Sequence, residues 1–76
     1  MDYKYIVVCS NYLNGSRTRI AYGLAVVDCN EDDTIILKSY PDLSGDFAEV
    51  EKLAISCNEY ELDIIHLDDI IEDFLE

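Results

Sequence analysis

The dipeptide Asn14–Gly15 lies between two runs of strand-forming residues, and it is the strongest local constraint in this sequence. A tight turn that needs positive φ at its central residues accepts Asn and Gly readily, and such a turn joins two antiparallel strands. The runs on either side, "YKYIVVCS" (3–10) and "RTRIAYGLAVVD" (17–28), are rich in β-branched and aromatic residues. The sequence therefore predicts a β-hairpin in its first half.

A third strand is predicted for "TIILKSY" (34–40), after the polar turn "CNEDD" (29–33). Pro41 is expected to end this strand, because proline has no N–H to donate to a neighbouring strand. Connections this short can join only antiparallel neighbours, so the three strands should form an antiparallel meander.

Helical signals begin at Asp46. Asp46 and Glu49 have the spacing of a capping box, with Asp in place of the usual Ser or Thr, and Asn58 is a plausible stop for the helix. The apolar residues between them recur at helical spacing: Phe47, Val50, Leu53, Ala54 and Cys57.

The last segment, "IHLDDIIEDFLE" (65–76), predicts a second amphipathic helix. Asp68 and Asp69 lie in its first turn, where the helix dipole favours negative charge. Its apolar residues follow i, i+3, i+4, i+7, i+8 spacing: Leu67, Ile70, Ile71, Phe74 and Leu75. The expected fold is a single α+β domain over residues 1–76, in the order β-β-β-α-α, with both helices packed on one face of the sheet.

The long strand 17–28 has apolar residues on both faces. One face is bulky, with Thr18, Ile20, Tyr22, Leu24 and Val26, and the other has mostly small residues that let a helix approach closely, Arg19, Ala21, Gly23, Ala25 and Val27. An antiparallel sheet covered on one side needs only one apolar face. The second face therefore suggests either a symmetric homodimer formed through it or a C-terminal helix that folds onto it.

The formal net charge is −12, and it is concentrated in the second half of the chain. Residues 42–76 contain twelve carboxylates and one lysine, whereas residues 1–41 contain five carboxylates and four basic residues. Such a charge repels nucleic acid and anionic membranes and favours a basic protein partner. The expected partner-binding residues are those of the last helix together with two arginines that suit carboxylate or phosphate: Asp68, Asp69, Glu72, Asp73 and Glu76, with Arg17 and Arg19.

Cys9, Cys29 and Cys57 are an odd number of cysteines with no CxxC pair, which argues against a disulfide framework and a zinc knuckle. No signal peptide and no membrane span is recognisable, so a cytoplasmic location is expected. No nucleophile elbow, glycine-rich phosphate loop or HExxH motif is present, and neither a cofactor nor a catalytic residue is expected.

His66, Asp69 and Asp73 have spacings of three and four, which place them on one helix face. An imidazole with two carboxylates could hold a divalent metal. The alternative is that this is the solvated face of an amphipathic helix, because like charges at i, i+4 cost only about 0.2–0.5 kcal/mol.

The segments "RIAYGLAVVD" (19–28), "LAISCNEYELDIIHL" (53–67) and "DDIIEDFLE" (68–76) resemble a family of small uncharacterised bacterial proteins. That family has a Tyr-Gly strand followed by a Cys-Asn, His-Leu and Glu-Asp-Phe-Leu ending. The matching positions are Tyr22, Gly23, Cys57, Asn58, His66, Leu67, Glu72, Asp73, Phe74 and Leu75. The resemblance implies a small cytoplasmic bacterial domain with no assigned activity and no assigned catalytic residue.

These observations favour a non-enzymatic acidic interaction module that binds a basic protein surface. One alternative is a nucleic-acid mimic of the anti-CRISPR or anti-restriction type, whose carboxylates would imitate phosphates and block a DNA- or RNA-binding protein. A second alternative is a metal-dependent enzyme that uses His66, Asp69 and Asp73.

Overall fold

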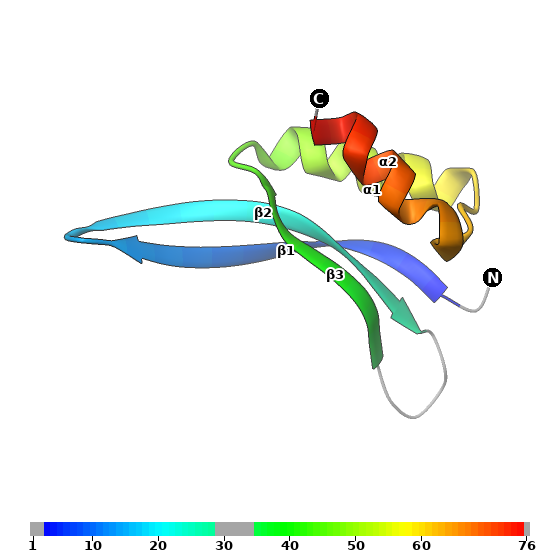
Figure 1. Ribbon diagram of the computed structural model, residues 1–76, viewed down its shortest axis with the longest axis horizontal. Helices are drawn as coiled ribbons and strands as arrows, with labels where there is room; N and C mark the ends of the chain where they lie inside the picture. The colour runs from blue at the N-terminus through cyan, green and yellow to red at the C-terminus, as the bar shows by residue number, and fades with distance from the viewer. Residues whose placement is uncertain (1–2, 29–34, 76) are drawn as a thin grey trace.

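The computed structural model describes residues 3–28 and 35–75 of the chain. The elements follow one another as β1 (Tyr3–Asn14), β2 (Arg17–Asp28), β3 (Ile35–Ser44), α1 (Phe47–Glu59), a 3-10 helix η1 (Ile64–His66) and α2 (Leu67–Leu75). The strands form one antiparallel sheet with β2 in the centre. Both helices lie over the same side of this sheet (Figure 1). The predicted α+β fold with β-β-β-α-α order is confirmed, and α2 does not cover the second face.

The first hairpin is confirmed, but its turn is shifted by one residue from the prediction. Asn14 pairs with Arg17, so Gly15 and Ser16 form the two-residue loop. Gly15 has a φ of +68°. Ser16, the second central residue, does not have a positive φ. The loop therefore has the pattern of a type II′ turn, whereas a turn with positive φ at both central residues, as expected for Asn-Gly, would be type I′.

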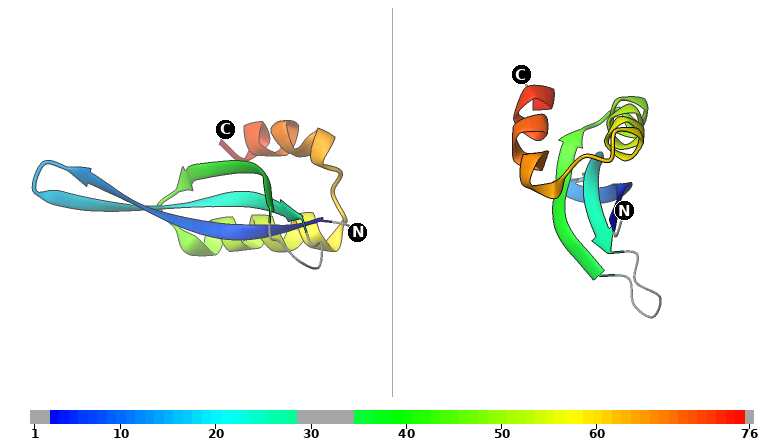
Figure 2. Two further views of the ribbon diagram at one scale, coloured as in Figure 1. Left: turned by 90° about the horizontal axis from the view of Figure 1, so that it is seen from below. Right: turned by 90° about the vertical axis from the view of Figure 1, so that its right-hand side faces the viewer.

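The hairpin continues well beyond the helices (Figure 2). This extension, residues 11–20, is called the hairpin arm, and every side chain described within it is exposed. Leu13 is 83% exposed, and neither sheet neighbour nor helix supports the arm at this end. The arm therefore adds little to the core.

The third strand does not end at Pro41 as expected but runs on to Ser44. Proline is tolerated because β3 is an edge strand and because the register shifts between the pairs Tyr22–Ser44 and Leu24–Tyr40. Gly23 lies opposite this irregularity. A Cβ on Gly23 would be 2.0 Å from the carbonyl oxygen of Tyr40, so the small residue accommodates the β3 backbone and not a helix.

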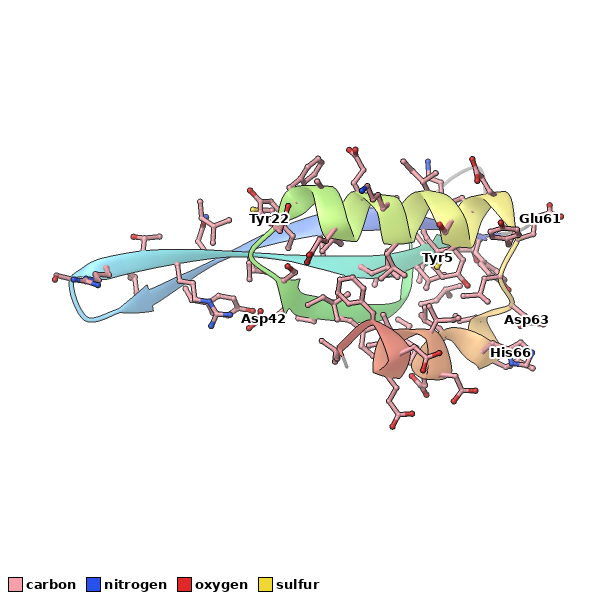
Figure 3. The ribbon with its side chains drawn as sticks, turned by 90° about the horizontal axis from the view of Figure 1, so that it is seen from above. Tyr5, Tyr22, Asp42, Glu61, Asp63 and His66 are labelled. Carbon is pink, nitrogen blue, oxygen red and sulfur yellow. The ribbon has the colours of Figure 1, made fainter. Side chains whose placement is uncertain are left out.

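The core lies between the bulky face of the sheet and the two helices. Viewed from the helix side, Tyr5 lies between α1 and α2 (Figure 3). The buried cluster takes residues from four elements: Tyr5, Leu24, Val26, Ala54, Cys57, Leu67 and Ile71. The helices thus pack on the bulky face, and the small residues Ala21 and Ala25 are buried on the other face within the sheet itself.

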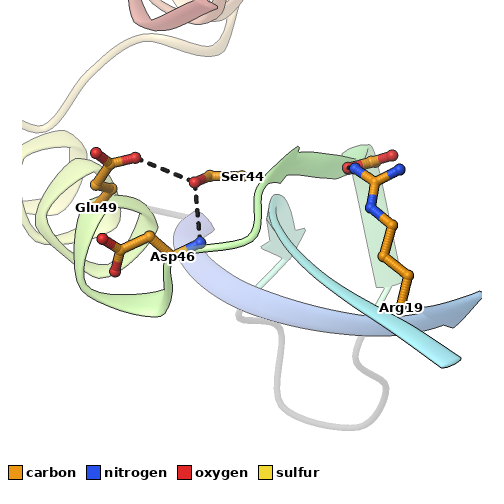
Figure 4. Close-up of polar contacts among 5 residues, drawn as sticks. Arg19, Ser44, Asp46 and Glu49 are labelled. Carbon is orange, nitrogen blue, oxygen red and sulfur yellow. Dashed lines mark hydrogen bonds and ion pairs between the residues drawn. The ribbon is translucent and has the colours of Figure 1, made fainter.

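Asp46 caps α1 as predicted, but the capping box has an additional member. The Asp46 carboxylate accepts a hydrogen bond from the Ala48 N–H at 3.0 Å. The Ser44 hydroxyl accepts the Asp46 N–H at 3.0 Å and donates to Glu49 at 3.1 Å (Figure 4). Ser44, the last residue of β3, therefore links the strand to the start of the helix.

Asn58 does not end α1; it joins the helix to the edge of the sheet. Its side-chain amide accepts the Tyr5 N–H at 2.8 Å and donates to the Tyr5 carbonyl at 2.8 Å. Tyr5 is in the edge strand β1, so these two backbone groups lie on the side that no strand pairs. The amide takes the place of one residue of a neighbouring strand.

The helix ends at Glu59, with Tyr60 as its C-cap, in a Schellman motif. The Leu62 N–H donates to the Cys57 carbonyl at 2.9 Å, and the Glu61 N–H donates to the Asn58 carbonyl at 3.2 Å. Glu61 has a φ of 48°, in the left-handed region that glycine normally occupies at this position.

Replacing Asn58 with alanine should lower the free energy of unfolding by about 1–3 kcal/mol, because both edge groups of Tyr5 lose their partner. Asn11→Ala is the matched control, since Asn11 is an exposed residue of β1, the strand that contains Tyr5. Urea unfolding followed by circular dichroism measures the difference. Equal midpoints for the two variants would contradict the role given to Asn58.

Replacing Glu61 with glycine should raise the free energy of unfolding by about 1 kcal/mol, because glycine adopts the left-handed conformation without a steric cost. Glu61→Gln keeps the strained backbone and removes only the charge, so it should leave stability unchanged. Thermal unfolding of both variants separates the two effects, and a similar gain in both would show that charge is responsible.

Candidate protein-interaction surface

Helix α2 has four exposed carboxylates, which are called the acidic surface: Asp68, Asp69, Glu72 and Asp73. Leu67 and Ile71 are the buried residues of the same helix. Residues three and four apart share a helix face, so Leu67 and Ile71 mark the buried face of α2. The four acids lie one or two positions after these two in the sequence and are therefore turned outward. The prediction that the acids line the solvated face of this helix is confirmed, and Glu76 lies outside the described residues.

Asp68 has a structural partner. Lys38 Nζ lies 2.8 Å from its carboxylate, and the Tyr40 hydroxyl also donates to it. Both partners are in β3, and the Lys38 ammonium lies 5.7 Å from the centroid of the Tyr40 ring. Asp68 therefore attaches the start of α2 to the edge of the sheet, and sets the orientation of the remaining acids.

Asp69, Glu72 and Asp73 make no ion pair within the described part of the chain. Glu72 and Asp73 are in the last turn of α2, which has no basic residue. The negative end of the helix dipole disfavours carboxylates at that position. These charges are therefore unfavourable for the helix itself.

A groove between α1 and α2 lies next to the acidic surface. It encloses a cavity of about 90 Å³. Its residues define the interhelix groove: Leu53, Ser56, Cys57, Tyr60, Leu62 and Ile70. Cys57 forms part of the buried core, whereas Tyr60 is 83% exposed at the margin.

Two tyrosines of β1 fix the end wall of this groove. The Tyr5 hydroxyl donates to the Leu62 carbonyl at 2.7 Å. The Tyr3 hydroxyl accepts the Ile64 N–H at 2.9 Å and lies 3.4 Å from the same Leu62 carbonyl. Burial raises the pKa of Tyr5 to about 12, with smaller contributions from Tyr3, Cys57 and Asp63. The segment between the helices is thus held against the sheet.

Cys57 does not have the features of a nucleophile. Burial raises the pKa of the Cys57 thiol, which keeps it protonated at neutral pH, whereas a reactive cysteine needs a lowered pKa. Cys9 is a free, exposed thiol. Cys29 lies outside the described residues.

His66, Asp69 and Asp73 are not brought together as a set of metal ligands. Among the described residues no group of three or more His, Cys, Asp or Glu side chains is arranged to hold an ion. His66 ends η1 and is exposed, pointing away from the sheet (Figure 3).

The two arginines are on the hairpin arm and not beside the acidic surface. Arg19 lies 3.3 Å from the Asp42 carboxylate, an exposed pair that contributes little stability. Arg17 makes no ion pair within the described residues. The predicted set of binding residues is therefore divided between two separate regions, and only the α2 carboxylates form one surface.

The second face of the sheet, where the sequence suggests a homodimer, is buried along β2 but keeps an exposed apolar side chain at Ile36 of β3, which pairs with Val27 and is 60% exposed. Ala21, Ala25 and Val27 are all buried within the single chain. Ile6 and Val8 of β1 are only partly exposed on the same face. The dimer stays a prediction.

Along residues 1–76 the chain matches a protein family described as a family of unknown function, DUF6514. It belongs to that family. The predicted membership of an uncharacterised family is confirmed at this level. No curated protein and no solved structure matches the chain.

DUF6514 membership assigns no activity, so the chemistry of the site must be inferred from its residues. None of the described helices is long and apolar enough to cross a membrane. The acids are recognisable in the sequence, but the interhelix groove is not, because Leu62 lies in the irregular segment between the helices. A glycine at position 61 would have indicated the Schellman motif, but glutamate stands there.

The raised pKa of Tyr5 predicts a loss of stability in alkali. An unfolded tyrosine ionises near pH 10 and Tyr5 near 12, so the stabilisation is complete below about pH 10 and is lost as pH rises towards 12. The stability advantage of the wild type over Tyr5→Phe should therefore shrink by about 1 kcal/mol between about pH 8 and about pH 11.

Urea unfolding at both pH values measures this difference. The contributions of the other titrating groups to the pH dependence are the same in the two proteins and cancel. Tyr60→Phe removes an exposed hydroxyl and should show no such change. If the difference in the free energy of unfolding between the wild type and Tyr5→Phe is the same at both pH values, the pKa of Tyr5 is not raised by folding.

Proposed function

We propose that this protein is a non-enzymatic interaction module whose acidic surface binds a basic surface of another protein. The observation that supports this proposal is the presence of exposed carboxylates, Asp69, Glu72 and Asp73, without an ion-pair partner in the described chain. Clustered charge of one sign steers a partner of opposite charge and raises the association rate.

The position of these charges adds to the argument. Glu72 and Asp73 oppose the dipole of their own helix, so folding alone does not account for them. Asp68, in contrast, already has partners within the chain, the Lys38 ammonium and the Tyr40 hydroxyl. We therefore assign binding to Glu72 and Asp73, together with Asp69, which lies in the favourable first turn of α2 but has no ion-pair partner in the described chain.

We also propose that the module acts in the cytoplasm of a bacterium. The free thiols of Cys9 and Cys57 support a reducing compartment, where cysteines stay unpaired. The ending that contains Glu72 and Asp73 supports the bacterial family resemblance.

The double substitution Glu72→Gln/Asp73→Asn should weaken binding and stabilise the protein. Removing two charges from the negative end of the helix dipole should raise the free energy of unfolding by about 1 kcal/mol. The partner for this test is a basic protein captured from a bacterial lysate and then purified. The double substitution should weaken its binding at least tenfold. Titration calorimetry at low and high salt measures the affinity, and salt should weaken the wild-type complex.

Glu51→Gln/Glu61→Gln is the matched control, because it changes net charge by the same amount at exposed positions outside α2. It should leave the affinity unchanged. Equal weakening by both double variants would show that net charge and not the acidic surface matters. A captured partner that binds DNA, and that DNA displaces from this protein, would support the nucleic-acid mimic instead.

A further inference from the structure

We propose that the interhelix groove is the anchor site of this interaction, and that it takes one branched aliphatic side chain from a basic peptide segment. This inference rests on the proposed function and names the kind of partner segment. Three features of the groove support it: an apolar lining, carboxylates along the margins and a rigid end wall.

The lining suits an aliphatic group. Leu53 and Ile70 face the groove from the two helices, and Leu62 closes it at the end where α1 stops. The cavity of about 90 Å³ is smaller than the ~150 Å³ apolar cavity that holds benzene. It therefore suits a side chain the size of leucine better than an aromatic ring or a lipid chain.

The floor of the groove has no charge to satisfy. Cys57 is the buried residue of the lining, and its thiol stays neutral because burial raises its pKa. Ser56 is exposed and lies at the margin. A side chain that enters the groove therefore needs no hydrogen-bonding group of its own.

The margins of the groove favour cations. On α2, Asp73 lies three residues after Ile70, and therefore on the same side of the helix. On α1, Glu49 lies four residues before Leu53, and Glu59 lies three residues after Ser56. By the same rule Lys52, four residues before Ser56, lies on the groove side of α1, so three carboxylates and one cation lie around the opening. Lysine or arginine residues that flank an aliphatic anchor would meet these carboxylates.

The groove is also built before a partner arrives. The Schellman motif joins the Leu62 N–H to the Cys57 carbonyl, and the Tyr5 hydroxyl holds the Leu62 carbonyl. The backbone of Leu62 is thus bonded to α1 through Cys57 and to β1 through the Tyr5 side chain. A preformed pocket lowers the entropy that binding must overcome.

Two synthetic peptides test the inference. One is a short lysine-rich peptide with a single central leucine, and its twin has alanine at that position. Methyl NMR titration should show shifts at Leu53, Leu62 and Ile70 with the leucine peptide. The leucine peptide should bind about tenfold more tightly than the alanine twin, because only it buries an aliphatic side chain.

Ser56→Phe should remove this difference, because the ring at the margin occupies the groove from an exposed helical position. Ser56→Ala is the control and should keep the preference. Equal affinity for both peptides with the wild type would overturn the anchor, as would an undiminished preference in Ser56→Phe.

The failure of the anchor and of the proposed function can be distinguished. If both peptides bind equally and Glu72→Gln/Asp73→Asn weakens both, the acidic surface binds without an anchor. If the leucine peptide keeps its tenfold preference but Glu72→Gln/Asp73→Asn leaves both affinities unchanged, the anchor stands and the proposed binding role of the acidic surface is wrong.

Discussion

One side-chain amide joins the end of α1 to the free edge of the sheet. Asn58 occupies the free edge of β1 by bonding both backbone groups of Tyr5, as a fourth strand would. An edge strand normally leaves these groups to water. Because the same tyrosine bonds the Leu62 carbonyl through its hydroxyl, a single residue of β1 positions the end of α1 and the segment that leads to α2. The interhelix groove exists because these two attachments hold the helices at a fixed spacing.

The carboxylates of the chain have different roles, and their local partners separate them. Asp46 caps α1, and Asp68 attaches α2 to Lys38 and Tyr40. Glu72 and Asp73 have no such partner in the described chain and lie at the unfavourable end of a helix dipole. Proteins often retain residues that lower stability where binding needs them. A charge that costs stability is therefore better support for a binding role than a charge that also holds the fold together.

The sequence predicted the type and order of the elements because hydrophobic periodicity and turn residues are local signals. It failed where the outcome depends on tertiary contacts. Pro41 stays in a strand because β3 is an edge strand with irregular register, which no local pattern reveals. Glu61 takes a left-handed conformation that its identity does not favour, because the attachment of Leu62 to Cys57 and Tyr5 imposes it. The acids of α2 were predicted as a solvated face, but the groove beside them was not, because its walls come from separate segments.

His66 and Asp73 illustrate how the meaning of a sequence pattern changes with its surroundings. Their spacing with Asp69 suggested a metal site, since all three share a helix face. In the structure His66 ends η1, whereas Asp69 and Asp73 belong to α2, and the residues that line the interhelix groove include neither His66 nor Asp73. A metal would need several of these side chains to converge on one point. The spacing of these residues therefore reflects exposed positions, and the groove beside them is lined by other residues of the two helices and of the segment between them.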